Sequence, residues 1–226
     1  MKRFYKAAET GEGGRILLDG RIVKTPGRRD LALPTGALAE AVADEWNAQR
    51  AAIDPRAMPL TGLAYAALDR IAPDSAGFAR GLAAYGESDL VCYRAEAPAA
   101  LVSRQAERWD PILAWAQQRY DAVFELATGI VHMPQPAETL ARLGAAVMTR
   151  DAFALAGLSP LVTVSGSLLI ALALAEGALP LGEAWAAATL DEQWQAALWG
   201  EDAEAAAALA SRRRDFEAGA RFLALL

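Results

Sequence analysis

The chain has 226 residues, of which 54% are hydrophobic and 22% charged, a composition typical of globular proteins and unlike that of disordered chains. Its formal net charge is −6 at pH 7, which disfavours non-specific nucleic-acid binding because such binding needs a basic surface. With one cysteine and one histidine, the sequence excludes an internal disulfide and metal sites built from several cysteines or histidines.

The first 34 residues carry the clearest β pattern. Two short β-rich runs, residues 16–18 and 21–24, flank an Asp-Gly pair at 19–20, which supplies the positive φ angles of a two-residue hairpin turn. We expect two further short strands, at residues 31–33 and 3–6.

Helical periodicity dominates from residue 35 onward. Thr35 is a suitable N-cap, and Leu38, Val42 and Trp46 recur every four residues, which predicts a first helix ending near residue 50. Residues 90–93 fit either a buried strand or a helical turn. Further helices are expected at residues 60–71, 74–85, from 99 with a restart or kink at Pro111, 138–148, 151–156, 161–175, 181–198 and 202–223.

The sequence thus predicts an α+β protein with a small N-terminal antiparallel β-rich domain, residues 1–34, and a larger, mostly α-helical domain, residues 35–226. Between Asp151 and Glu176 the chain carries no charge, which raises the alternatives of a membrane span and a core helix. A glycine, a serine and a proline at 157–160 interrupt this run, and the remaining residues 161–175 are too few to span a bilayer. A core helix is therefore predicted.

The stretch LDEQWQAALWGED, residues 190–202, combines acidic and aromatic residues at the end of a predicted helix. On one helix, Trp185, Glu192 and Trp199 fall on a line because they are spaced seven apart. A carboxylate between tryptophans costs free energy unless it has a partner, either inside the fold or on another protein. Both alternatives are open for Glu192.

No sequence motif points to catalysis. The chain lacks a phosphate-binding loop, a zinc-protease motif, an EF-hand loop and a nucleophile elbow. His132 stands in a proline-rich loop without an identifiable partner, and Cys92 is favoured as a buried structural thiol over a nucleophile. We therefore expect a binding protein rather than an enzyme, with some tryptophans as interface anchors.

Eight phrases occur in an order and spacing that resemble one protein family. They are RFYK at 3–6, LDGRIVKTP at 18–26, LALPT at 31–35, EWNAQ at 45–49, MPLT at 58–61, SDLVCYRAEAP at 88–98, WDPIL-W at 109–115 and LDEQWQAALWGED at 190–202. The chain resembles, over nearly its whole length, the Atp-twelve family of chaperones, which assemble the catalytic head of the F-type ATP synthase.

The resemblance implies an assembly chaperone that binds the unassembled α subunit and prevents its aggregation until a β subunit replaces it. It implies no nucleotide, metal or other cofactor. Because no mitochondrial transit segment is recognisable, the chain is similar to a bacterial member, for which we expect a cytoplasmic location. We also expect a monomer when free, without nucleic acid and without a membrane span.

The family's acidic, tryptophan-containing segment matches Asp191, Glu192, Trp194, Gln195, Trp199 and Gly200, and the first five are expected as contacts to the α subunit. The match is looser over the following turn, 196–198. Three residues from elsewhere complete the expected partner-binding set: Asp89, Arg94 and Trp46.

Two alternatives accompany this interpretation. Glu192 pairs either with a basic group of the α subunit or with an internal cation, for example Arg94. The protein is either the chaperone or a small-molecule-binding protein or enzyme with a cleft between its β and helical parts, where Asp89, Tyr93 and Arg94 would converge.

Overall fold

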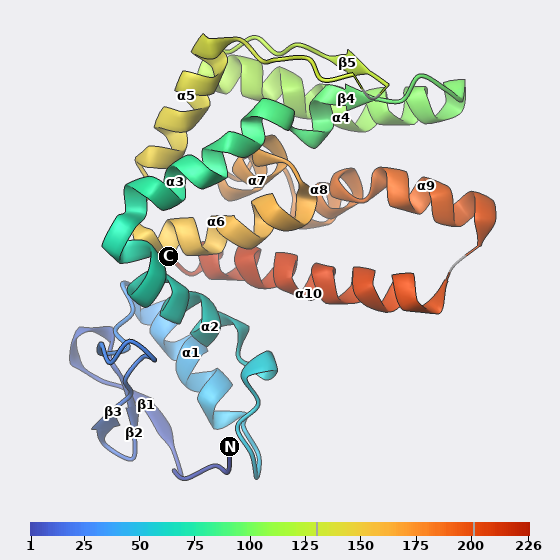
Figure 1. Cartoon of the computed structure of the whole chain (residues 1–226). Helices are drawn as coiled ribbons and strands as arrows, with labels where there is room; N and C mark the ends of the chain where they lie inside the picture. The colour runs from blue at the N-terminus through green and yellow to red at the C-terminus, as the bar shows by residue number, and fades with distance from the viewer. Residues whose placement is uncertain (130, 201) are drawn as a thin grey trace.

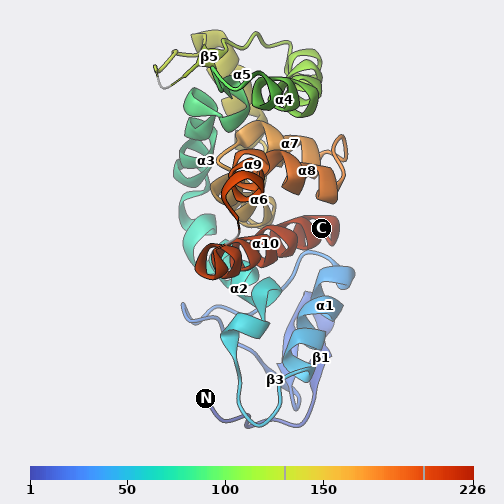
Figure 2. The same cartoon turned by 90° about the vertical axis from the view of Figure 1, so that its right-hand side faces the viewer.

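The computed structural model describes residues 1–129, 131–200 and 202–226, and Ile130 and Glu201 lie outside the described residues. Figures 1 and 2 show an elongated molecule with the N-terminal sheet at one end and the segment around residues 99–148 at the other. The C-terminal helices lie between these ends. A small antiparallel sheet followed by helices confirms the predicted α+β class.

The N-terminal sheet consists of β1 (Ala8–Thr10), β2 (Ile16–Leu18) and β3 (Arg21–Ile22), in the order β1-β2-β3. Strands β2 and β3 form the predicted hairpin, in which Leu18 pairs with Arg21. Asp19 and Gly20 form the turn with φ of 48° and 78°, the positive angles that the Asp-Gly pair predicts.

The two further expected strands differ from prediction. Residues 31–33 contribute a single antiparallel bridge, between Ala32 and Arg15. Residues 3–6 are not a strand, because side chains take up their main-chain groups: the Arg3 guanidinium donates to the Lys6 carbonyl (2.6 Å), and the Lys6 N–H donates to the Asp19 carboxylate (3.0 Å).

Helix α1 (Gly36–Asn47) packs on β1 and covers the sheet. Thr35 caps it as predicted, with its hydroxyl oxygen accepting from the Leu38 N–H (3.2 Å). Leu38 and Val42 are fully buried on its inner face. The proposed domain boundary after residue 34 stays a prediction, and it would separate the sheet from the helix that covers it.

Helix α2 (Pro59–Ala66) continues as a π-helical turn (Ala67–Ile71), and α3 (Ser75–Ala83) follows, capped by Asp74. Residues 90–93 combine both predicted alternatives: a 3-10 turn (Leu90–Cys92) leads into strand β4 (Tyr93–Arg94). Strand β4 pairs in parallel with β5 (Ala127–Thr128).

Helix α4 (Ala99–Tyr120) runs without a break through Pro111, and α5 (Ala137–Met148) packs beside α3. The predicted interruption at residues 157–160 is wrong. Helix α6 (Ala152–Ser165) includes Pro160 and ends at Gly166, whose φ is 67°. Packing decides this, because Pro160 and Gly157 lie at the crossing with the last helix, where a side chain on Gly219 would meet them.

Helix α7 (Leu168–Ala175) is the centre of the core, and residues 168–173 are all almost inaccessible to solvent. The uncharged run is buried in the core as predicted, but the single helix expected at 161–175 is divided at Gly166 and Ser167 between α6 and α7. Among the described residues, no helix combines the length and the apolar character that crossing a membrane requires.

The chain ends with α8 (Leu181–Ala188), α9 (Leu190–Trp199) and α10 (Ala203–Ala224). The single helix predicted over 181–198 bends at Thr189 (φ −114°, ψ 16°), whose hydroxyl donates to the Trp185 carbonyl (2.8 Å). The bend removes the expected line of tryptophans: Trp185 is 8% exposed and Trp199 is 79% exposed. Such side-chain bonding to the preceding turn is a common way to bend a helix.

Candidate partner-binding surface

Helix α9 is held at its first turn and free at its last. Leu190 is buried, and the Asp191 carboxylate accepts a hydrogen bond from Gln105 Nε2 (2.8 Å). The Gln105 side-chain oxygen in turn accepts from the Ala95 N–H (2.8 Å). At the other end Leu198 is 58% exposed and Trp199 79% exposed. In Figure 1, α9 lies at the edge of the molecule, beyond α8.

A groove of about 410 Å³ runs between α9 and α10. Its walls include Glu192, Gln195 and Trp199 from α9 and Leu209 and Arg212 from α10. Arg212 Nη1 lies 2.6 Å from Glu192 Oε1, and both side chains are partly exposed. Glu192 therefore has an internal partner, which is Arg212 and not the Arg94 named from the sequence.

A second groove, of about 460 Å³, lies on the other side of α9, against β4 and α4. Asp191, Trp194 and Leu198 line it from α9, and Gln195 and Trp199 line both grooves. The structure thus gathers on this one helix all five residues that the acidic, tryptophan-containing segment places there. We call the exposed part of α9 with its two grooves the α9 surface.

Arg94 lies in the wall of the second groove with its charge already paired. Its Nη2 is 2.8 Å from Asp110 Oδ1, and its Nε donates to the Val91 carbonyl (3.0 Å). The guanidinium also stacks over the Trp109 ring, 5.3 Å from the ring centre. These contacts position β4 beside α4, so Arg94 shapes the groove rather than offering a free cation.

Asp89 and Trp46 do not lie at the α9 surface. Asp89 is 1% exposed, and its carboxylate accepts from Ser167 Oγ (2.5 Å) and the Leu169 N–H (2.9 Å) at the start of α7. Burial raises the pKa of Asp89 to about 6. Trp46 is buried in the N-terminal part, packed edge-on against the Tyr5 ring. Neither residue is part of the α9 surface.

Several phrases that carry the family resemblance make hydrogen bonds inside the fold. The Glu45 carboxylate of EWNAQ accepts from the N–H groups of Leu60 and Thr61 in MPLT, both at 2.8 Å. The Trp109 indole donates to the Ala187 carbonyl (2.9 Å). Arg212 and Gln105, which hold α9, were not singled out from the sequence, because their partners are 20 and 86 residues away.

The polar groups of the enzyme alternative do not converge. Asp89 is enclosed in the core, whereas Tyr93 and Arg94 line the second groove, and the Tyr93 hydroxyl lies 2.8 Å from His132 Nδ1. Burial raises the pKa of the Cys92 thiol to about 12, which suppresses the thiolate that a nucleophile requires.

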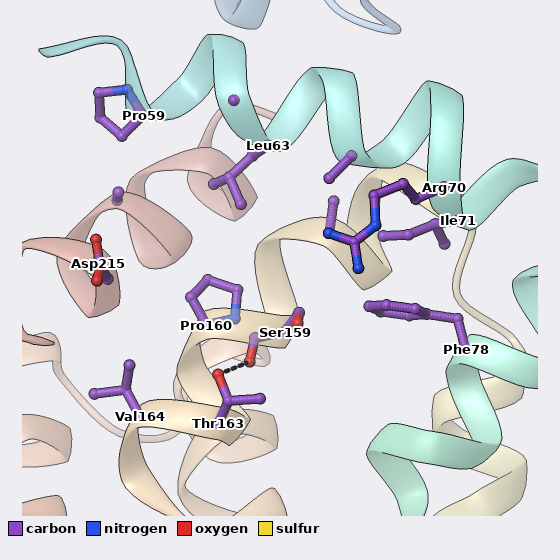
Figure 3. Close-up of a pocket in the computed structure, with 14 residues that line it drawn as sticks. Pro59, Leu63, Arg70, Ile71, Phe78, Ser159, Pro160, Thr163, Val164 and Asp215 are labelled. Carbon is purple, nitrogen blue, oxygen red and sulfur yellow. Dashed lines mark hydrogen bonds between the residues drawn. The ribbon is translucent and has the colours of Figure 1, made fainter. Parts of the chain in front are cut away.

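A further groove of about 390 Å³ lies between α2, the π-helical turn, α6 and α10. Figure 3 shows Leu63, Phe78 and Pro160 on its walls and Arg70 reaching into it. The Thr163 hydroxyl donates to the Ser159 carbonyl (2.9 Å), so α6 satisfies this hydroxyl itself. The groove is predominantly apolar, and none of its lining residues lines either groove of the α9 surface.

Comparison with known proteins identifies the family. The family described as ATP12 chaperone protein matches residues 2–117. A crystal structure of Atp12 from Paracoccus denitrificans is 43% identical, with a TM-score of 0.94 over 99% of this chain and 97% of that one. The Atu1473 protein of Agrobacterium tumefaciens is 42% identical, with a TM-score of 0.93 over 98% of this chain and 85% of that one. Helix α9 lies beyond the matched residues 2–117, whereas the aligned structures cover almost the whole chain. The chain belongs to the ATP12 chaperone family.

Proposed function

We propose that this protein is an assembly chaperone for the F1 sector of ATP synthase. In this proposal it binds the unassembled α subunit through the α9 surface and prevents its aggregation until a β subunit takes its place. Membership of the ATP12 chaperone family supports the assembly role, and the exposed end of α9 supports the binding surface. A monomeric free state and a cytoplasmic location belong to the same proposal.

The physical reason for such a chaperone lies in its client, the free α subunit. A subunit that normally pairs with another exposes apolar surface and unpaired strand edges when alone, and both promote aggregation. Trp199 and Leu198 present apolar surface at the end of α9, and aromatic anchors of this kind dominate binding energy at interfaces.

Release requires that the contact be displaceable. The acidic groups of the α9 surface, Asp191 and Glu192, remain partly accessible although each has an internal partner. Charge complementarity at partly exposed groups speeds association and selects partners without producing an irreversible complex. We therefore propose that the carboxylates orient the α subunit as it binds and that the Trp199 end of α9 supplies most of the affinity for it.

The test is capture of separately expressed α and β subunits by the immobilised chain. The proposal expects capture of α and not of β, and expects added chain to keep free α from scattering light as it aggregates. Capture of neither subunit would contradict the assembly role. Capture of β alone would contradict the choice of client.

A further inference from the structure

The charge of the chain is strongly polarised along its length. Residues 1–34 hold eight basic and four acidic residues, a net charge of +4, and include all three lysines of the protein. The rest of the chain holds 14 basic and 24 acidic residues, a net charge of −10. The basic segment forms one end of the elongated molecule (Figures 1 and 2). An acidic partner is therefore attracted to the N-terminal sheet and repelled by the rest of the surface.

The sheet carries an apolar groove of about 760 Å³. It runs between the N-terminal segment, strand β3 and the following residues up to Pro26, with Trp46 and Tyr65 behind them. Two large apolar side chains at its rim are turned toward solvent: Phe4, 67% exposed, and Ile22, 41% exposed. Exposed apolar residues that gather around one groove indicate a contact site.

Strand β3 is also an edge of the sheet, because β2 is its only neighbour in the order β1-β2-β3 among the described residues. Just beyond it, Lys24 forms an isolated antiparallel bridge with Asp30 on the side of the Val23 and Thr25 hydrogen bonds. The Val23 N–H donates to the Ile16 carbonyl and the Thr25 N–H to the Arg29 carbonyl, both at 2.8 Å. Successive N–H groups of a strand point in opposite directions, so those of Ile22 and Lys24 face away from these partners. This leaves two outward main-chain donors two residues apart, the spacing that an added strand pairs with.

The charged groups beside this edge favour an acidic occupant. Among the ion pairs of the described residues, Arg21 takes part in none, whereas Lys24 pairs with Asp30. Asp19, the carboxylate in the groove wall, is engaged by the N–H groups of Lys6 and Ala7 (3.0 Å each). Its charge is thus already solvated by the main chain, and the Arg21 cation stays available to a partner.

From these observations we propose that the edge of β3 binds an extended acidic segment of the client, which adds as a strand and places an apolar side chain in the groove. This inference rests on the proposed function and extends it. It gives the client a second contact, at the N-terminal sheet, in addition to the α9 surface. Two separate contacts raise the overall affinity through effective concentration, while each remains weak enough to be displaced.

The test is hydrogen exchange of the full chain, free and bound to purified α subunit, resolved to single amides. The Ile22 and Lys24 amides should exchange at least tenfold more slowly in the complex. The Val23 and Thr25 amides, already hydrogen-bonded to the carbonyls of Ile16 and Arg29, serve as internal references.

Two variants separate charge from apolar contact. Arg21→Glu and Ile22→Lys should each weaken binding of the α subunit about tenfold with an unchanged melting temperature. Met148→Lys is the matched control, since Met148 is 45% exposed on α5 and lies in none of these grooves, and it should bind as the wild type does.

The outcomes are distinguishable. If the α subunit binds but the two amides are not protected and Arg21→Glu binds normally, the β3 inference is wrong and the chaperone proposal stands. If the α subunit does not bind the wild-type chain at all, both the β3 inference and the chaperone proposal are wrong. If the amides become protected when the chain alone is concentrated, the occupant is a second copy and the inference is overturned.

Discussion

Glu192 has an internal partner in Arg212 and yet remains accessible, and this combination decides how it is to be tested. An exposed ion pair contributes only about 0–1 kcal/mol to stability. The pair joins α9 to α10 across the groove between them, and Arg212 also donates to the Val164 carbonyl (3.0 Å). A change at Glu192 therefore has a small structural effect, against which a loss of client binding can be measured.

Charge reversal at Glu192 should weaken α-subunit binding. We expect Glu192→Lys to reduce capture at least tenfold while the free energy of unfolding falls by less than about 1 kcal/mol. The double variant Glu192→Lys with Arg212→Glu restores an internal pair with reversed polarity. If Glu192 contacts the client, the double variant stays defective in capture. Recovery of capture in the double variant would show that Glu192 acts only by holding α9.

Asp89 gives the protein a specific pH dependence. Burial raises its pKa from 3.8 to about 6, so the folded chain binds this proton more tightly than the unfolded chain. The carboxyl therefore lowers stability progressively as the pH rises from about 4 to about 6, and by a constant amount above that. Between pH 7 and pH 5 the wild type should gain about 1 kcal/mol relative to Asp89→Asn, measured by urea unfolding. A pH-independent difference between the two proteins would contradict this assignment.

At the scale of helices, α8 and α9 offer two tryptophans in opposite environments on either side of the Thr189 bend. Trp199→Ala should leave the free energy of unfolding within about 0.5 kcal/mol of wild type, because the side chain is 79% exposed, and should weaken α-subunit capture more than tenfold. Trp185→Ala, at 8% exposure, should instead destabilise the fold by about 3–5 kcal/mol. Normal capture by the Trp199 variant would remove the proposed anchor.

The crossing of α6 and α10 depends on glycine at 219. A Cβ there would lie 2.6 Å from Pro160 Cγ and 2.7 Å from the Gly157 carbonyl oxygen. Because the second contact is main chain, Gly219→Ala should destabilise by about 1–3 kcal/mol. Gly144→Ala in α5, where a Cβ meets nothing within 4 Å, should stabilise by about 0.5–1 kcal/mol. Thermal unfolding tests this: the melting temperature should fall for Gly219→Ala and rise for Gly144→Ala. Similar changes of melting temperature in both variants would contradict the close crossing of α6 and α10.

For the whole molecule, the buried apolar residues form one continuous cluster from Tyr5 to Phe222. The Thr35 hydroxyl donates to the Leu225 carbonyl (2.5 Å), which ties the C-terminal end to the start of α1. We therefore expect the slowest-exchanging amides of β2 and α7 to report the same free energy of opening. A distinctly lower value in β2 would instead support an independent domain at residues 1–34.

Local patterns were sufficient for several parts of the fold. The Asp-Gly hairpin, the Thr35 cap and the core character of α7 depend on a few adjacent residues, and all three are confirmed. Three features were predicted wrongly: the strands expected at 3–6 and 31–33 and the helix interruption expected at 157–160. Long-range contacts decided two of them. For residues 3–6 the Asp19 carboxylate decided the outcome, and for residues 157–160 the crossing with α10 did.

The sequence by itself determined the fold class, the family resemblance and the five residues that meet on α9, because these follow from short-range patterns and from the order of phrases. Only the tertiary structure decided that Asp89 and Trp46 are buried and that Glu192 pairs with Arg212. It also decided that the bend at Thr189 separates Trp185 from Trp199. Burial and ion pairing depend on residues far away in the chain. The free energies of burial and of ion pairing depend on how much water the packed chain excludes, and a short stretch of sequence does not show this.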